Sequence, residues 1–206
     1  MIRLTHNTAS PFVRKTMMVV IETGLSDRIQ LVPSDPWNPD DRLQEINPLG
    51  KVPALVAADG TLFTGSALIC EYLDSLHDGR KLFPEAGEER WRALRLHGLA
   101  DGLLEAGVSR IYEQLRRPAD KQWETWIDRQ NGKIFGALDE LERQVAAGDI
   151  SEEPTIGELT LAAGLGYLDF RFPEMAWREG RAALASWSAA IAERPCVAQT
   201  QPFLPS

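Results

Sequence analysis

Cysteine and histidine are scarce in this sequence, and their scarcity argues against two classes of site. The chain has only 2 cysteines and 3 histidines among 206 residues. Cys70 and Cys196 lie far apart and belong to no Cys-x-x-Cys or Cys/His cluster, so neither a disulfide framework nor a zinc site is indicated. We therefore expect no metal site. The histidines, which also lack metal-ligand spacing, are His6, His77 and His97.

An excess of basic residues and long apolar runs are missing as well. The chain has 22 Lys and Arg against 30 Asp and Glu, a net charge of −8, whereas proteins that bind nucleic-acid phosphates concentrate basic side chains. It has no stretch of about 18 apolar residues, which a membrane-spanning helix would need. Residues 1–6 lack the basic stretch and apolar run of a signal peptide. We expect a cytoplasmic protein with no nucleic-acid partner and no membrane partner.

The hydrophobic period changes repeatedly over residues 1–78, which predicts an α/β domain. An apolar run at 2–5 predicts a strand, and apolar residues at helical spacing after Ser10 and Pro11 predict a helix with Ser10 as its N-cap. An alternating segment at 28–32 completes a βαβ unit. The pattern further predicts a hairpin with strands at 53–57 and 61–64, a helix opened by Gly65-Ser66, and a linker at 79–84.

Residues 85–206 show helical spacing throughout, which predicts a second, all-α domain. Thr155 and Glu158 have the spacing of a capping box at the start of an apolar segment. Two other helices are expected at about 120–147 and 182–193. The first helix of this domain should end before Pro118 and carry a buried stripe, whose members are Leu104, Val108, Ile111 and Leu115.

Four motifs carry a resemblance to a known family; they are Ser10–Lys15 (SPFVRK), Asn47–Leu55 (NPLGKVPAL), Ser66–Leu73 (SALICEYL) and the Thr155 capping box. The order of elements, with Val52-Pro53 before the third strand, resembles the thioredoxin fold, but Ser10-Pro11 stands where thioredoxins carry their cysteines. With the helical domain, the chain resembles the cytosolic glutathione transferases, specifically bacterial members whose first helix opens with Ser-Pro-Phe. This resemblance implies a homodimer that takes glutathione as co-substrate and conjugates its thiolate to small hydrophobic electrophiles.

The resemblance also implies which residues activate the thiol. Ser10 is the catalytic candidate, because a hydroxyl at the start of the first helix can donate a hydrogen bond to a thiolate where backbone N–H groups also converge. Thr8 is the reserve candidate. From residue type alone, Ser10 could instead serve only as the helix cap.

Further residues are implied for binding glutathione. Val52-Pro53 resembles a cis-proline loop whose main chain pairs with the cysteinyl part, although most X–Pro bonds are trans. Lys51 would pair with the glycyl carboxylate, or be a solvated loop residue. Ser66 at the start of the third helix would bind the γ-glutamyl carboxylate, or only cap the helix.

The sequence departs from the family at Gly65, where relatives usually have Glu or Asp near the ligand's ammonium. We expect Asp101, brought from the partner subunit in the dimer, to substitute for that acid; its alternative is a solvated acid on a helix.

The electrophile would be held between the domains in an apolar cleft, with Phe12, Val108 and Tyr112 as candidate walls or, alternatively, core residues. Two other functions stay open at this point. One is a glutathione-dependent peroxidase, isomerase or dehalogenase, and the other is a binding scaffold without catalysis.

Overall fold

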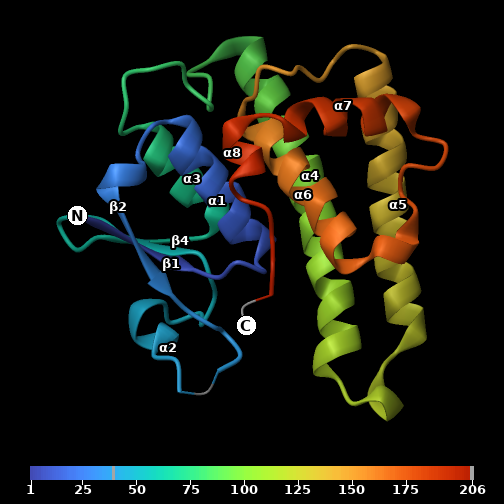
Figure 1. Ribbon diagram of the computed structural model, residues 1–206, viewed down its shortest axis with the longest axis horizontal. Helices are drawn as coiled ribbons and strands as arrows, with labels where there is room; N and C mark the ends of the chain where they lie inside the picture. Colours follow the sequence, from blue (N-terminus) through green and yellow to red (C-terminus); the bar gives the residue numbers. More distant parts are fainter. Residues whose placement is uncertain (39, 205–206) are drawn as a thin grey trace. The chain divides into compact units, whose positions relative to one another are not determined.

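The computed structural model describes residues 1–38 and 40–204, which form two compact units (Figure 1). Of the described residues, one unit contains 1–38, 40–85 and 195–204, and the other contains Ala86–Arg194. The sequence predicts a helical domain that extends to residue 206, whereas the helical unit of the structure ends at Arg194. The physical reason is that α8 (Pro195–Ala198) packs against α1 (Pro11–Glu22) of the first unit.

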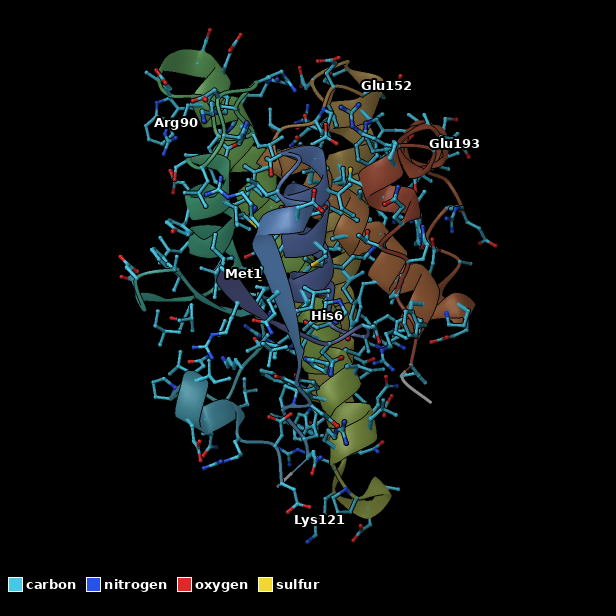
Figure 2. All side chains as sticks on the ribbon, turned by 60° about the vertical axis from the view of Figure 1, so that its left-hand side comes forward. Met1, His6, Arg90, Lys121, Glu152 and Glu193 are labelled. Atoms are coloured by element: carbon cyan, nitrogen blue, oxygen red, sulfur yellow. The ribbon has the colours of Figure 1, made fainter. Side chains whose placement is uncertain are left out.

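The first unit is built on a mixed four-stranded sheet in the order β2-β1-β3-β4. β1 is parallel to β2, whereas β1 with β3 and β3 with β4 are antiparallel. Figure 2 shows His6 at the end of β1, opposite to Met1. The expected βαβ and ββα units are confirmed. The strands are β1 (Ile2–His6), β2 (Ile29–Pro33), β3 (Ala54–Val56) and β4 (Leu62–Thr64).

Helix α1 occupies the core of this unit and packs against α3 (Ser66–Asp74) as well as α8. Its start is the predicted one, because Ser10 has an extended backbone at the N-cap and Pro11 takes the first helical position. Its buried residues include Val13, Met18, Val19 and Val20. The short elements of the unit are η1 (Ser26–Arg28) and α2 (Leu43–Ile46).

The second unit is entirely helical in its regular elements, and α6 (Ile156–Arg171) forms its centre. Every residue from 155 to 165 is buried, because α6 packs against α4 (Gly87–Arg116) and α7 (Ala182–Ala192). In Figure 2, Lys121 and Glu152 mark opposite ends of this unit. The other elements are η2 (Ala119–Lys121), α5 (Glu124–Ala146) and η3 (Pro173–Met175).

The predicted capping box at the start of α6 is confirmed. The Glu158 carboxylate accepts a hydrogen bond of 2.8 Å from the Thr155 backbone N–H, and the Thr155 hydroxyl accepts one of 3.2 Å from the Gly157 N–H. The predicted stripe of α4 is wrong at its far end: Leu104 is buried, but Leu115 is 60% exposed. Leu115 lies close to the end of α4, so the packed stretch of that helix stops before it. None of the helices in the described residues combines the length and apolar character needed to cross a membrane.

Candidate functional site

Three stretches of the chain meet at one edge of the sheet. β1 ends at this edge, and because β3 is antiparallel to β1, β3 begins there at Ala54. β4 is antiparallel to β3 and therefore ends at the same edge, where its last residue, Thr64, is paired with Ala54. Ser10 follows β1, Pro53 precedes β3 directly and Gly65 follows β4 directly. The sheet topology therefore brings these three residues, far apart in the sequence, to the same edge.

Ser10 is partly exposed, and its hydroxyl oxygen accepts a hydrogen bond of 3.3 Å from the Val13 backbone N–H. A hydroxyl has one proton to donate and two lone pairs that accept. The capping bond uses one lone pair and leaves the proton of Ser10 available. Capping the helix and donating to an anion are therefore compatible roles, and the Val13 N–H polarises the hydroxyl towards donation.

Thr8 is placed differently from Ser10. Its hydroxyl donates a hydrogen bond of 2.9 Å to the carbonyl oxygen of Phe203, in the segment that follows α8. The hydroxyl proton of Thr8 is therefore engaged in a hydrogen bond within the first unit. Sequence reasoning missed this contact because it joins residues 195 positions apart.

The loop before β3 is held by two buried polar side chains. The Val52–Pro53 peptide bond is cis, as the motif implies. The Thr5 hydroxyl oxygen accepts a hydrogen bond of 2.7 Å from the Ala54 backbone N–H. The Asn47 amide donates to the Lys51 carbonyl oxygen at 2.7 Å and is 1% exposed. Thr5 and Asn47 are positioning residues that sequence reasoning missed, although Asn47 stands in a quoted motif.

Val52 and Lys51 remain accessible at this loop. Val52 is partly exposed, and the ladders of β3 begin after it at Ala54, so the sheet does not use its main chain. Lys51 is exposed. A cavity of about 220 Å³ lies beside the loop, with Gln44 and Gly50 among its lining residues.

The start of α3 presents backbone N–H groups without a side-chain cap. Gly65 occupies the N-cap position with φ 84° and ψ 121°, and no side chain caps this helix. Ser66 is the first helical residue rather than the cap, and it is 7% exposed. Because the first N–H groups of a helix lack intrahelical partners and carry partial positive charge, this end of α3 can bind an anion.

Four predicted residues lie outside that sheet edge. Phe12 is partly exposed on α1, where the Lys15 ammonium lies 5.8 Å from its ring centroid. Asp101, Val108 and Tyr112 belong to α4 of the second unit, and their spacing of seven and four residues places them on one face of the helix. Tyr112 is 43% exposed, and the other two are partly exposed.

His6 is a titratable group at this edge of the sheet. Burial lowers the pKa of His6 at the end of β1 below its ordinary value, because the charged imidazole is less well solvated there. Within residues 1–38 and 40–204, no three His, Cys, Asp or Glu side chains group as a metal site requires. What the edge offers is two helix N-termini, a hydroxyl and free main-chain groups, which suits an elongated, partly anionic ligand.

Comparison with known proteins identifies the fold and the family. Residues 9–76 match the model of the glutathione S-transferase N-terminal domain, and residues 124–190 match that of the C-terminal domain. The uncharacterized GST-like protein YibF of Escherichia coli (strain K12) is 32% identical over 201 residues, which cover 97% of this chain and 98% of YibF. The chain belongs to the glutathione S-transferase family. Glutathione is the co-substrate of that family.

Solved structures of other glutathione S-transferase family members superpose on nearly the whole chain. One from Pseudomonas fluorescens Pf-5 has bound glutathione, a TM-score of 0.92 and 41% identity, and the match covers 99% of this chain and 100% of that one. A second structure from that bacterium contains S-(propanoic acid)-glutathione, with a TM-score of 0.89 and 40% identity over 98% of this chain and 100% of that one.

Proposed function

We propose that this chain is a glutathione transferase of the bacterial type whose first helix opens with Ser-Pro-Phe. Ser10 stabilises the thiolate of glutathione for conjugation to a small electrophile. The observation that carries the proposal is the geometry of Ser10: its oxygen accepts from the Val13 N–H, so its proton is free to be donated to sulfur. Thr8 has no catalytic role in this scheme, because its proton goes to the Phe203 carbonyl.

The energies required for thiolate formation match what this edge can supply. A thiol with a pKa near 8.5 is only a few per cent ionised at pH 7. Lowering that pKa by about two units requires about 2.7 kcal/mol of preference for the anion. A hydrogen bond from Ser10 to a charged sulfur contributes roughly 1.5–3 kcal/mol, and the N-terminus of α1 adds about 0.3–2 kcal/mol. Together they suffice without a general base.

We further propose that each stretch at the sheet edge binds one part of glutathione. The main chain of Val52, before cis-Pro53, pairs with the cysteinyl part as an added strand would. Ser66 and the uncapped N–H groups of α3 bind the γ-glutamyl carboxylate. Lys51 pairs with the glycyl carboxylate.

Gly65 leaves the ammonium of the γ-glutamyl part without an adjacent acid from this loop. We propose that the chain acts as a homodimer in which the partner subunit's Asp101 supplies that charge. An Asp101→Asn variant that binds glutathione as tightly as the wild type would contradict this assignment.

The acceptor is proposed to be a short electrophile that carries a carboxylate. The relative from Pseudomonas fluorescens that contains S-(propanoic acid)-glutathione supports this class, because that ligand is the product expected from glutathione and a three-carbon unsaturated acid. Phe12 is the proposed contact of the first unit for the apolar part of the acceptor.

The test is conjugation of glutathione to an unsaturated acid and to an activated aryl chloride, measured by loss of free thiol. We expect Ser10→Ala to lower kcat/KM by about 10- to 100-fold, the equivalent of one charged hydrogen bond. The matched control is Ser10→Asp, which keeps a helix-capping oxygen but has no proton to donate. It should restore thermal stability without restoring activity.

Two results would contradict the proposal. Full activity of Ser10→Ala would remove the role of the hydroxyl. Failure of the wild-type chain to bind immobilised glutathione would favour a binding scaffold over an enzyme.

A further inference from the structure

The turn that leads into α1 is fixed by hydrogen bonds of its own residues. The backbone N–H of Ser10 donates to the Asn7 carbonyl oxygen at 3.1 Å, which closes the turn. The Asn7 side chain ties the turn to the chain after β2, because its amide donates to the Ser34 carbonyl oxygen at 3.1 Å and its oxygen accepts from the Ala9 N–H at 3.1 Å. The remaining corner of the turn, at Thr8, is held by a distant part of the sequence.

The chain from α8 onward is anchored on both sides of Ser10. Within α8, the Val197 carbonyl oxygen accepts a hydrogen bond of 3.5 Å from the guanidinium of Arg14, which follows Ser10 on α1. Further along, the Phe203 carbonyl oxygen accepts one of 2.9 Å from the hydroxyl of Thr8, which precedes Ser10. Figure 1 shows the chain after α8 passing the start of α1. This chain therefore bridges the helix start that carries Ser10.

The end of this bridge is held mainly by its hydrogen bond to Thr8. Phe203 is 58% exposed and Leu204 is 62% exposed, so their side chains contribute little packing. A hydrogen bond between exposed neutral groups is weak on its own, and segments held in this way open locally far more often than the protein unfolds. Loss of the Thr8 hydroxyl should therefore release the end of the chain without unfolding the first unit.

We propose that Thr8 and the chain end at Phe203 are positioning elements for Ser10. This role rests on the function proposed above, in which Ser10 stabilises the thiolate. The Thr8–Phe203 hydrogen bond fixes the turn, and so keeps the Ser10 hydroxyl where its proton can reach the sulfur. Because a displacement of about 1 Å can remove most of the effect of a group on a reaction, a loose turn weakens thiolate stabilisation although Ser10 itself is unchanged. Thr8 thus acts through Ser10 and not on the sulfur.

The test is the substitution Thr8→Val, which keeps the shape of the side chain and removes the proton that the Phe203 carbonyl accepts. We expect kcat/KM for conjugation to fall by about 3- to 10-fold, the equivalent of one neutral hydrogen bond. The thiol pKa of bound glutathione should rise by about 0.5–1 unit. Thr8→Ser keeps the proton and should restore both values.

Two further full-length variants separate the hydrogen bond from general loosening. Thr23→Val is the matched control: it removes a hydroxyl that donates to the Val19 carbonyl oxygen at 2.7 Å, at the other end of α1, and it should leave both values unchanged. Phe203→Gly keeps the accepting carbonyl but gives the chain end more conformational freedom, so it should cause part of the Thr8→Val effect. In the double variant, Phe203→Gly should add nothing to Thr8→Val, because both act through the same hydrogen bond.

Amide hydrogen exchange measures the turn directly and needs no glutathione. The N–H groups of Ser10 and Val13 bond to the Asn7 carbonyl and the Ser10 hydroxyl, and in Thr8→Val they should exchange about 3- to 10-fold faster than in the wild type. Wild-type exchange rates in Thr8→Val would overturn the proposal, as would equal losses of activity in Thr8→Val and Thr8→Ser. If Ser10→Ala raises the thiol pKa and Thr8→Val does not, only the positioning role fails; if neither variant raises it, the proposed function fails.

Discussion

At the scale of single residues, the site depends on side chains that serve the fold and the ligand together. Ser10 caps α1 through its oxygen and, in the proposed mechanism, donates its proton in a hydrogen bond to the sulfur. Thr5 and Asn47 hold the loop before β3 by hydrogen bonds to the main chain of Ala54 and Lys51. In the proposed mechanism, the thiolate needs no general base, because Ser10 and the N-terminus of α1 lie at the same edge of the sheet.

Gly65 combines a backbone conformation that disfavours other residues with a place in the proposed glutathione site. Its φ of 84° with ψ of 121° is a conformation that costs other residues about 1–3 kcal/mol. A Cβ at this position would have no heavy atom within 4 Å, so the cost is conformational rather than steric. We infer that the chain has a relaxed backbone here in place of the acid that family members usually carry.

We predict that Gly65→Glu lowers Tm by several degrees and tightens glutathione binding by up to about 5-fold, the range of an exposed ion pair. Gly65→Ala is the matched control, because it introduces the same backbone strain without the charge. Thermal unfolding and glutathione titration of both variants check the prediction. If Gly65→Glu binds glutathione no more tightly than Gly65→Ala does, the assignment of the γ-glutamyl end to this loop is wrong.

At the scale of elements, the close approach of α4 and α6 holds the second unit together. A Cβ added at Gly157 of α6 would lie 2.8 Å from Leu96 Cβ and 2.9 Å from the Ala93 carbonyl oxygen. Backbone and a branched core side chain cannot move aside easily, so the glycine is required by packing. Gly132 on α5 is the opposite case: it is exposed and has no heavy atom within 4 Å of its Cβ direction.

We predict that Gly157→Ala destabilises the protein by about 1–3 kcal/mol through overpacking. The same change at Gly132 should stabilise it by about 0.5–1 kcal/mol, because alanine is the better helix former. Urea unfolding midpoints measure both effects. Equal stability of Gly157→Ala and the wild type would show that α4 and α6 are not as closely packed as described.

Elements with a clear period or a turn signal could be predicted from the sequence. The Ser10-Pro11 helix start, the hairpin with strands at 53–57 and 61–64 and the Thr155 capping box depend on residues that lie close together in the sequence. The four-residue α8 could not be predicted, because it is too short to show a period and is held by α1, far away in the sequence. The prediction that Leu115 is buried is wrong, because residue spacing does not show where the neighbouring helices stop covering the apolar stripe of α4.

At the scale of the whole molecule, the residues that matter come together through topology rather than through sequence proximity. Ser10, Pro53 and Gly65 share one edge because strand directions alternate, and this could be inferred once the fold resemblance was stated. The hydrogen bond between Thr8 and Phe203 could not be inferred, because it depends on a tertiary contact between residues of ordinary type.

The most direct test of the central claim is the thiol pKa of glutathione bound to the full-length protein, followed by the ultraviolet absorbance of the thiolate as pH is raised. For the wild type we predict a pKa about two units below the reference value near 8.5. Ser10→Ala should raise it by about one to two units, and Ser10→Asp should raise it further, because a nearby negative charge disfavours the thiolate. An identical pKa in the wild type and Ser10→Ala would contradict the account.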